Sequence, residues 1–259
     1  MHQKFDEIVA KIRQKRELSG IDSSLVSDLL EKYIKKAHLS LEGLSGSDIR
    51  CIVKDIRADL RNYVGRFQIG QKHKQKLLRE GDFEDLLKTH SSTKERIGFY
   101  PELRKLIYSL KPKSILDLGC GLNPIALASQ KVKYYASDIN TEELDLVRKF
   151  FEKKAINGET FICDLRNIEA CPLPRADICL IFKVLDIIEK NGHKIAEKII
   201  IKIPSRYLLV SFSTRKLSGK PMSHPQREWI ELLLRRLNYH FTIISSENEI
   251  FYLISKQPS

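Results

Sequence analysis

Two glycines separated by one residue stand at the centre of LDLGCGLNP, the stretch at positions 116–124. Gly119 and Gly121 can adopt positive φ and let a ligand approach the backbone closely. Pro124 suits the first turn of a helix, where its missing N–H costs nothing. A dinucleotide fingerprint, GxGxxG, would place its third glycine at this position. Because a proline stands there, the turn favours a ligand that carries an adenosine but no phosphates.

Three acidic residues accompany this turn, each at the end of a predicted strand. Asp117 comes just before the turn, Asp138 ends the second apolar run and Asp164 ends the third. Open parallel sheets bind ligands at the carboxyl ends of their strands, where an acid after the second strand accepts from ribose hydroxyls. Each acid alone could merely cap a helix. Three of them around one Gly-x-Gly turn predict a site for S-adenosylmethionine.

The elements that would position these groups follow from the apolar pattern. From Pro112 onward, short apolar runs such as SILDLG and KYYASDI alternate with helical patterns. This alternation is typical of βαβ units and a parallel sheet. Two close runs, HFTIISS and EIFYLIS, end the chain as a hairpin with its turn at Glu247-Asn248. We therefore predict the α/β class, a Rossmann-like class I methyltransferase with a seven-stranded sheet whose last strand is reversed.

The first hundred residues show a different spacing of apolar residues. Apolar residues recur at three- and four-residue spacing, as in Phe5, Ile8, Val9 and Ile12. Such spacing predicts amphipathic helices, and no strand-like alternation interrupts it. We divide the chain into an N-terminal all-helical domain at residues 1–100 and a methyltransferase domain at residues 101–259.

The charge of the chain favours a polyanionic partner. Lys and Arg number 45 against 33 Asp and Glu, a net charge of +12, and each phosphate contact made by such residues releases counterions. A basic run at positions 50–79 contains only two acids, Asp55 and Asp59. A basic helix face is often simply solvated, but beside a methyltransferase core we expect it to dock on RNA. The predicted RNA contacts are Arg50, Lys54, Arg57, Arg61, Arg66, Lys72, Lys74, Lys76 and Arg79, with Lys216 and Lys220 as a second, smaller group.

Composition also bears on location and metals. No segment approaches the roughly 20 apolar residues of a membrane span, and the N-terminal residues lack the apolar stretch of a signal peptide. The five cysteines form no CxxC pair, and their odd number argues against a disulfide framework. We expect a protein of the reducing cytoplasm without a metal site, and we take the monomer as the default state.

Four segments occur in an order that resembles one family. They are THSSTKER, LDLGCGLNP, IFKVLDIIE and SFSTRKLSGK, beginning at positions 89, 116, 181 and 211. Together they look like the aminoglycoside-resistance methyltransferases that modify N7 of a decoding-site guanine in small-subunit ribosomal RNA. The resemblance covers roughly the last two-thirds of the chain. One departure is Ser213, because the family usually has proline at the end of that Ser-Phe-x triplet.

The resemblance implies roles for particular residues. Arg96 would meet the cofactor carboxylate with a bidentate fork, although Ser92 and Glu95 could also form a capping box at a helix start. The resemblance also implies that Phe182, Lys183 and Ser211 position the target base. The implied cofactor residues are His90, Ser91, Ser92, Arg96, Asp117, Gly119, Gly121, Asp138, Ile139, Asp164, Leu165 and Phe182.

Guanine N7 carries an in-plane lone pair and no proton, so its methylation requires alignment and no general base. We therefore expect an S-adenosylmethionine-dependent methyltransferase acting on N7 of a decoding-site guanine in 16S rRNA of the small ribosomal subunit, as in aminoglycoside resistance. Three alternatives remain open. They are a methyltransferase for another rRNA base such as adenine N1, a small-molecule methyltransferase, and a non-catalytic RNA-binding protein.

Overall fold

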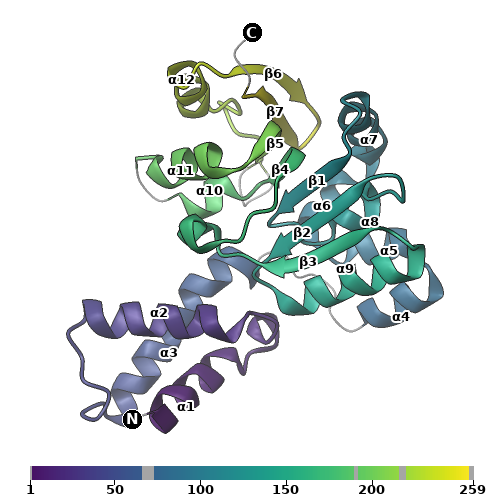
Figure 1. The fold of residues 1–259 in the computed structure, drawn as a ribbon. Helices are drawn as coiled ribbons and strands as arrows, with labels where there is room; N and C mark the ends of the chain where they lie inside the picture. Colours follow the sequence, from purple (N-terminus) through teal and green to yellow (C-terminus); the bar gives the residue numbers. More distant parts are fainter. Residues whose placement is uncertain (1, 66–72, 190–191, 216–219, 257–259) are drawn as a thin grey trace.

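A seven-stranded sheet forms the centre of the molecule (Figure 1). The computed structural model describes residues 2–65, 73–189, 192–215 and 220–256. The strand order is β3-β2-β1-β4-β5-β7-β6, with β7 antiparallel to both of its neighbours and the other pairs parallel. The strands are β1 (Ser114–Leu118), β2 (Lys133–Asp138), β3 (Gly158–Ile162), β4 (Ala176–Phe182), β5 (Ser205–Ser213), β6 (His240–Ser245) and β7 (Glu249–Ser255).

This topology confirms the predicted sheet and its reversed last strand. Successive strand side chains point to opposite faces, so Ile115 and Leu116 of β1 belong to two different hydrophobic clusters. Both faces are therefore buried, as is usual where helices cover a parallel sheet on each side. The helices that follow β1 are α8 (Asn123–Leu127), α9 (Thr141–Lys154), η5 (Leu165–Ala170, 3₁₀), α10 (Leu185–Ile188), α11 (Lys194–Lys202) and α12 (Glu228–Arg236).

The N-terminal helices bury a core of their own. They are α1 (His2–Arg13), the 3₁₀ turn η1 (Arg16–Leu18), α2 (Ser23–Lys36), α3 (Gly46–Leu60) and the π-helical turn η2 (Arg61–Gly65). The buried residues include Ile8, Ile12, Leu30, Ile56 and Leu60, which the helical spacing predicts. We call this part, residues 2–65, the helical unit.

The next helices pack on the sheet and not on the helical unit. Leu78, Leu86 and Leu87 share a hydrophobic cluster with residues of β1 and α9. The packing therefore changes earlier in the chain than the predicted boundary at residue 100. These helices are α4 (Lys74–Glu80), α5 (Phe83–Lys88), α6 (Ser91–Arg96), the 3₁₀ turn η4 (Ile97–Phe99) and α7 (Tyr100–Ser109).

The helical unit is attached to the loop that follows β2. The Thr141 N–H donates to the Gly20 carbonyl at 2.7 Å, and the Asp22 N–H donates to the Ile139 carbonyl at 3.1 Å. A Cβ on Gly20 would stand 2.4 Å from Asn140 Oδ1, so glycine is needed for this close approach. In Figure 1 the helical unit accordingly lies beside the ends of β2 and β3.

In the part of the chain that the structure describes, no helix has both the length and the apolar character needed to cross a membrane.

Gly158 allows β3 and α9 to pack closely, because a Cβ there would stand 2.3 Å from the Phe151 ring. We predict that Gly158→Ala lowers the free energy of unfolding by about 1–3 kcal/mol, as expected for overpacking a core. Gly98→Ala is the matched control, since a Cβ on Gly98 has no neighbour within 4 Å; its change should stay within about 0.5 kcal/mol. Urea denaturation measures both. Equal stabilities of the two variants would contradict the prediction.

Candidate cofactor and target-base site

A cavity opens where the carboxyl ends of β1, β2 and β4 meet, the position at which open α/β sheets bind ligands. Most residues assigned to the cofactor or the target base line it. Ser91, Arg96, Asp117 and Ser211 are not part of the lining. The predicted residues that line the cavity are His90, Ser92, Gly119, Gly121, Asp138, Ile139, Asp164, Leu165, Phe182 and Lys183.

The glycine turn has the conformation that its sequence predicts. Gly119 has φ +65° and Gly121 has φ +47°, a region that side chains with a Cβ rarely adopt. Space is also short, because a Cβ on Gly119 would stand 2.6 Å from Val184 and one on Gly121 would stand 3.2 Å from the His90 ring. Backbone conformation and packing therefore both require glycine at these positions.

Asp138 is fixed by backbone N–H groups at the end of β2. Its Oδ1 accepts from the N–H groups of Ile139 at 2.7 Å and Asn140 at 3.0 Å, and its Oδ2 accepts from the Gly121 N–H at 2.9 Å. Burial, together with the nearby carboxyl of Glu143, raises the pKa of Asp138 to about 6. The carboxyl group thus ties the glycine turn to the loop after β2.

Asp117 is fully buried beneath the turn. Its Oδ2 accepts from the Tyr134 hydroxyl at 2.7 Å, while its Oδ1 is buried with no hydrogen-bond partner in the described part of the chain. Burial raises the pKa of this carboxyl to about 7. Because this carboxyl is buried outside the cavity lining, it can influence a ligand there through its charge and not by direct contact.

Asp164 caps the short helix η5, because its Oδ1 accepts from the Arg166 N–H at 3.0 Å. Its two carboxylate oxygens also accept hydrogen bonds from Nε and Nη2 of the Arg166 guanidinium, at 2.8 Å each. The same guanidinium lies 4.5 Å from the centroid of the Tyr63 ring. Since Tyr63 belongs to η2 and also lines the cavity, the helical unit supplies one wall of the site.

Arg96 does not point where the resemblance implies. It is 2% exposed, its Nε and Nη2 donate to Glu249 at 3.0 and 2.8 Å, and its Nη1 donates to Asn123 at 2.6 Å. Contact with a cofactor carboxylate would require it to leave these partners. The capping box proposed for Ser92 and Glu95 is wrong as well, because α6 begins at Ser91 without a side-chain cap.

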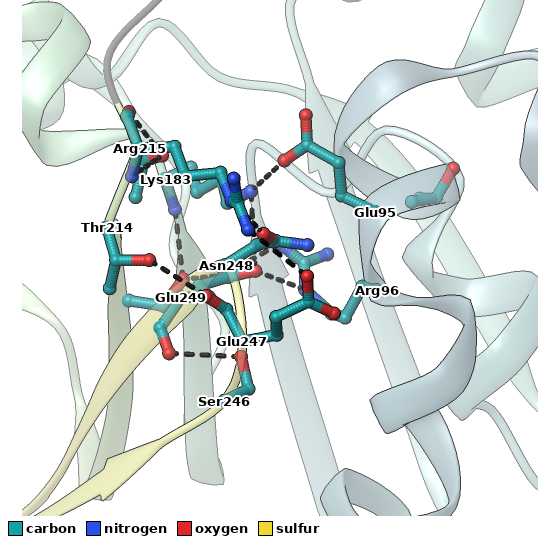
Figure 2. A network of polar contacts seen from close by, with 12 residues as sticks. Glu95, Arg96, Lys183, Thr214, Arg215, Ser246, Glu247, Asn248 and Glu249 are labelled. Atoms are coloured by element: carbon teal, nitrogen blue, oxygen red, sulfur yellow. Dashed lines mark hydrogen bonds and ion pairs between the residues drawn. The ribbon is translucent and has the colours of Figure 1, made fainter. Parts of the chain in front are cut away.

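Lys183 lies at the centre of a polar network beside the cavity (Figure 2). Its φ of +59° is unusual for a residue with a side chain, and such strain persists only where the surroundings impose it. The Lys183 N–H donates to the Ser211 carbonyl at 3.0 Å. Its Nζ donates to Glu95 at 2.6 Å and stands 3.5 Å from Glu249. Ser211 in turn donates its hydroxyl to Glu249.

Several site residues escaped the sequence analysis. Tyr63 lies in the N-terminal helical region, and Glu143 and Arg166 lie further along the chain; none of the three belongs to a motif. Glu249 had a signal that could have identified it, because it is an acid at the start of the apolar run EIFYLIS. An acid that is 2% exposed needs buried cationic or hydrogen-bonding partners, which here are Arg96, Lys183 and Ser211.

Cys163 and Cys171 form a disulfide, with their Cα atoms 5.4 Å apart. The odd number of cysteines argued against a disulfide framework, and one bridge is nevertheless present among the described residues. Cys51, Cys120 and Cys179 are free. The bridge spans Asp164 and the whole of η5, and because Asp164 and Leu165 line the cavity, it fixes one side of it. A spacing of eight residues carries no CxxC signature.

A basic groove lies on the helical unit, along α1 and α3. Arg50, Lys54, Arg57 and Arg61 line it together with Lys11. These four arginine and lysine residues are three or four positions apart in the chain and therefore lie on one surface. Two of these side chains also have partners within the helical unit. Arg57 Nε donates to the Ile12 carbonyl at 3.2 Å, and Arg61 pairs with Glu17 at 3.0 Å.

The other predicted RNA contacts differ from one another in exposure. Lys74 is buried and pairs with Glu143 at 3.0 Å, so its assignment to an RNA-facing surface is wrong. Three predicted contacts, Arg66, Lys72 and Lys216, lie outside the described residues. The exposed members of the set are Lys76, Arg79 and Lys220.

Comparison with known proteins gives consistent matches. The family described as ribosomal RNA methyltransferase (FmrO) matches residues 32–253. A Serratia marcescens protein named 16S rRNA (guanine(1405)-N(7))-methyltransferase is 32% identical over 187 residues, 69% of this chain and 72% of that protein. A Frankia casuarinae protein with the same name is 25% identical over 178 residues. That alignment spans 66% of this chain but only 62% of the Frankia protein.

Solved structures agree on the fold. The 16S rRNA methyltransferase RmtF, crystallised with S-adenosyl-L-homocysteine, superposes with a TM-score of 0.81 at 22% identity over 99% of this chain and all of that one. The 16S rRNA methylase RmtB gives 0.77 at 23% identity over 98% of both chains. The fold therefore extends over the helical unit as well as the sheet.

Glu249 neutralises Arg96 in a buried site, and breaking such a pair leaves an uncompensated charge. We predict that Glu249→Gln lowers the free energy of unfolding by about 3 kcal/mol. Glu247→Gln is the control two residues away, because the Glu247 side chain is 80% exposed; its pair with Arg215 is worth less than about 1 kcal/mol. Denaturant titration of both variants measures the difference. A Glu249 variant as stable as the Glu247 variant would refute the prediction.

Proposed function

Since this chain belongs to the FmrO family of ribosomal RNA methyltransferases, we propose that it methylates N7 of a decoding-site guanine in 16S rRNA. The curated relatives are named for guanine 1405, and this is the position that we propose. The methyl donor is S-adenosylmethionine. The observation that carries this proposal is the cavity at the carboxyl ends of β1, β2 and β4, lined by the glycine turn, Asp138 and Asp164.

The residues of the site suit this cofactor. The turn at Gly119 and Gly121 gives close access to the backbone, and Asp138 and Asp164 place acceptors for ribose and adenine at the cavity. Asp117 lies buried beneath the turn and outside the cavity lining, so we assign it an attraction for the ammonium group at the methionine end of the cofactor that acts through charge and not by contact. We accordingly assign His90, Ser91 and Ser92 to that same end.

When bound, the cofactor supplies a methyl group on a sulfonium, which is transferred by in-line displacement. N7 has a lone pair and no proton, so no side chain has to act as a base. The task of this chain is to hold the two reactants in line, which lowers the barrier by reducing the entropy lost in reaching the transition state. This role agrees with a site made of rigid, buried contacts.

We assign positioning of the target base to Phe182, Lys183 and Ser211. Phe182 and Lys183 line the cavity, and the Phe182 ring contacts both the Arg96 guanidinium, 4.8 Å away, and the Phe251 ring. Ser211 acts through Lys183, because its carbonyl accepts the Lys183 N–H. The Nζ of Lys183 is a donor suited to the O6 edge of guanine, which is adjacent to N7.

We propose that the basic groove of the helical unit contacts phosphates of the ribosomal RNA. N7 lies on the major-groove edge, which is too deep and narrow in A-form RNA for a side chain to reach. The guanine must therefore leave the stack, at a cost of a few kcal/mol. Phosphate contacts at a distance from the cavity can offset that cost.

We also propose that the protein is a monomer that acts on ribosomes in the cytoplasm. Within residues 2–65, 73–189, 192–215 and 220–256, no group of three or more His, Cys, Asp or Glu side chains is arranged to hold a metal ion.

The test is methyl transfer from labelled S-adenosylmethionine to intact small subunits, to naked 16S rRNA and to whole ribosomes. We expect label in the small subunit, released as N7-methylguanine and mapped to guanine 1405. Label on adenine N1 or at another guanine would overturn the proposed target. Absence of transfer to all three substrates would overturn the proposed activity.

The combined variant Arg50→Ala, Lys54→Ala tests the docking role. We expect weaker binding to the small subunit and a smaller salt dependence, with the slope of log K against log salt reduced by about 2 units because two phosphate contacts are lost. Affinity for S-adenosylhomocysteine should not change. An unchanged salt slope in filter binding would show that the groove does not contact RNA.

Cofactor binding should depend on pH through Asp117. Its carboxyl has a pKa of about 7 in the free protein, and only the ionised form attracts the ammonium group. Affinity for S-adenosylhomocysteine should therefore rise about tenfold between pH 6 and pH 8, measured by calorimetry. Asp117→Asn should remove most of this rise and leave the smaller contribution of Asp138. A pH-independent affinity in the unsubstituted protein would exclude this electrostatic attraction.

A further inference from the structure

Lys74 and Glu143 form a buried ion pair that the proposed mechanism does not use. Their side chains are 8% and 4% exposed, and Lys74 Nζ lies 3.0 Å from Glu143 Oε1. The other carboxylate oxygen, Oε2, lies 3.9 Å from Nε2 of His90. Burial dominates the environment of His90 and lowers the pKa of the imidazole, so the ring is neutral near pH 7.

Glu143 belongs to the cavity as well as to this pair. It stands in the first turn of α9, five residues after Asp138, and lines the same cavity together with His90 and Gly121. Two carboxyl groups therefore face the space beside the glycine turn. Buried acids without a cationic partner are costly, which explains why a lysine accompanies the second one.

The hydrogen-bonding capacity of Asp138 suggests what the second acid does. A carboxylate offers about four acceptor positions. Backbone N–H groups use three of them, two on Oδ1 and one on Oδ2. One acceptor position remains for a ligand, whereas a ribose presents two hydroxyl groups. The second hydroxyl needs another acceptor at the same side of the cavity.

We propose that Glu143 is a second acidic ligand of the cofactor ribose, and that Lys74 is the positioning residue that holds its carboxylate there. This inference rests on the proposed function, because the ribose is that of S-adenosylmethionine. Asp138 accepts from one hydroxyl and Glu143 accepts from the other. Lys74 supplies a positive charge beside Glu143 and fixes the direction of its carboxylate.

A purely structural role is the competing explanation. Lys74 also joins α4 to α9, and a second link joins the same helices, from Lys153 Nζ to the Arg79 carbonyl at 2.7 Å. If the pair only ties two helices together, its loss should not change which cofactor hydroxyls the protein recognises. Discrimination between ligands that lack one hydroxyl therefore separates the two explanations.

The experiment is calorimetric titration with S-adenosylhomocysteine and its 2′-deoxy and 3′-deoxy analogues. The proteins are the unsubstituted chain, Lys74→Met, the double variant Lys74→Met, Glu143→Met, and Lys76→Met. The double variant replaces both partners by apolar side chains of similar length, a change that avoids an unpaired buried charge. Lys76→Met is the matched control on the same helix, because the Lys76 side chain is 64% exposed.

We expect the unsubstituted protein to bind each deoxy analogue about tenfold more weakly than the parent compound, as for loss of one hydrogen bond to a charged acceptor. The double variant and Lys74→Met should bind the parent about tenfold more weakly and no longer distinguish it from one of the two analogues. Discrimination against the other analogue, which depends on Asp138, should remain. Lys76→Met should match the unsubstituted protein in all three cofactor titrations, because Lys76 is assigned to RNA and not to the cofactor site.

Retention of discrimination against both analogues in the double variant would overturn the inference. This ratio compares ligands within one variant, so it does not depend on what fraction of the sample is folded. Failure of the unsubstituted protein to bind S-adenosylhomocysteine at all would instead refute the proposed function. The two failures are therefore distinguishable.

Discussion

Two opposite charges are buried side by side where α6 meets β7, because Arg96 and Glu249 are each 2% exposed. Charges removed from water are tolerated only with close partners and satisfied hydrogen bonds. Glu249 meets this requirement by accepting from Arg96, while Ser211 and Lys183 approach the same carboxylate. One side chain at the start of the reversed strand thus fixes α6, the end of β4 and β5 relative to one another.

This arrangement explains why the reversed strand matters to the site. In an all-parallel sheet the start of β7 would lie at the opposite edge, far from the cavity. Because β7 runs antiparallel to β5, with Ser211 paired to Phe251 and Ser213 to Glu249, its first residue comes to the carboxyl edge. There it supports the strained backbone of Lys183, which lines the cavity.

The helical unit is joined to the cofactor side of the sheet and not to a remote surface. Gly20 and Asp22 bond to the loop after β2, and Tyr63 stacks under Arg166, which pairs with Asp164. Groups that hold the unit in place are therefore neighbours of groups proposed to hold the ribose and adenine. A displacement of the unit would therefore act directly on the cavity wall.

Local patterns in the sequence determined the α/β fold, the succession of strands along the chain, the glycine turn and the placement of acids near three strand ends. Each of these depends on residues close together in the chain, where periodicity and φ restrictions act. The tertiary structure alone decided that Arg96 pairs with Glu249, 153 residues away, that Lys74 pairs with Glu143, 69 residues away, and that Cys163 is bridged to Cys171. A basic residue in a helical run looks the same whether it faces solvent or a buried acid. Only the packing of α4 on α9, and of α6 on β7, removes water from these charges and so fixes their partners.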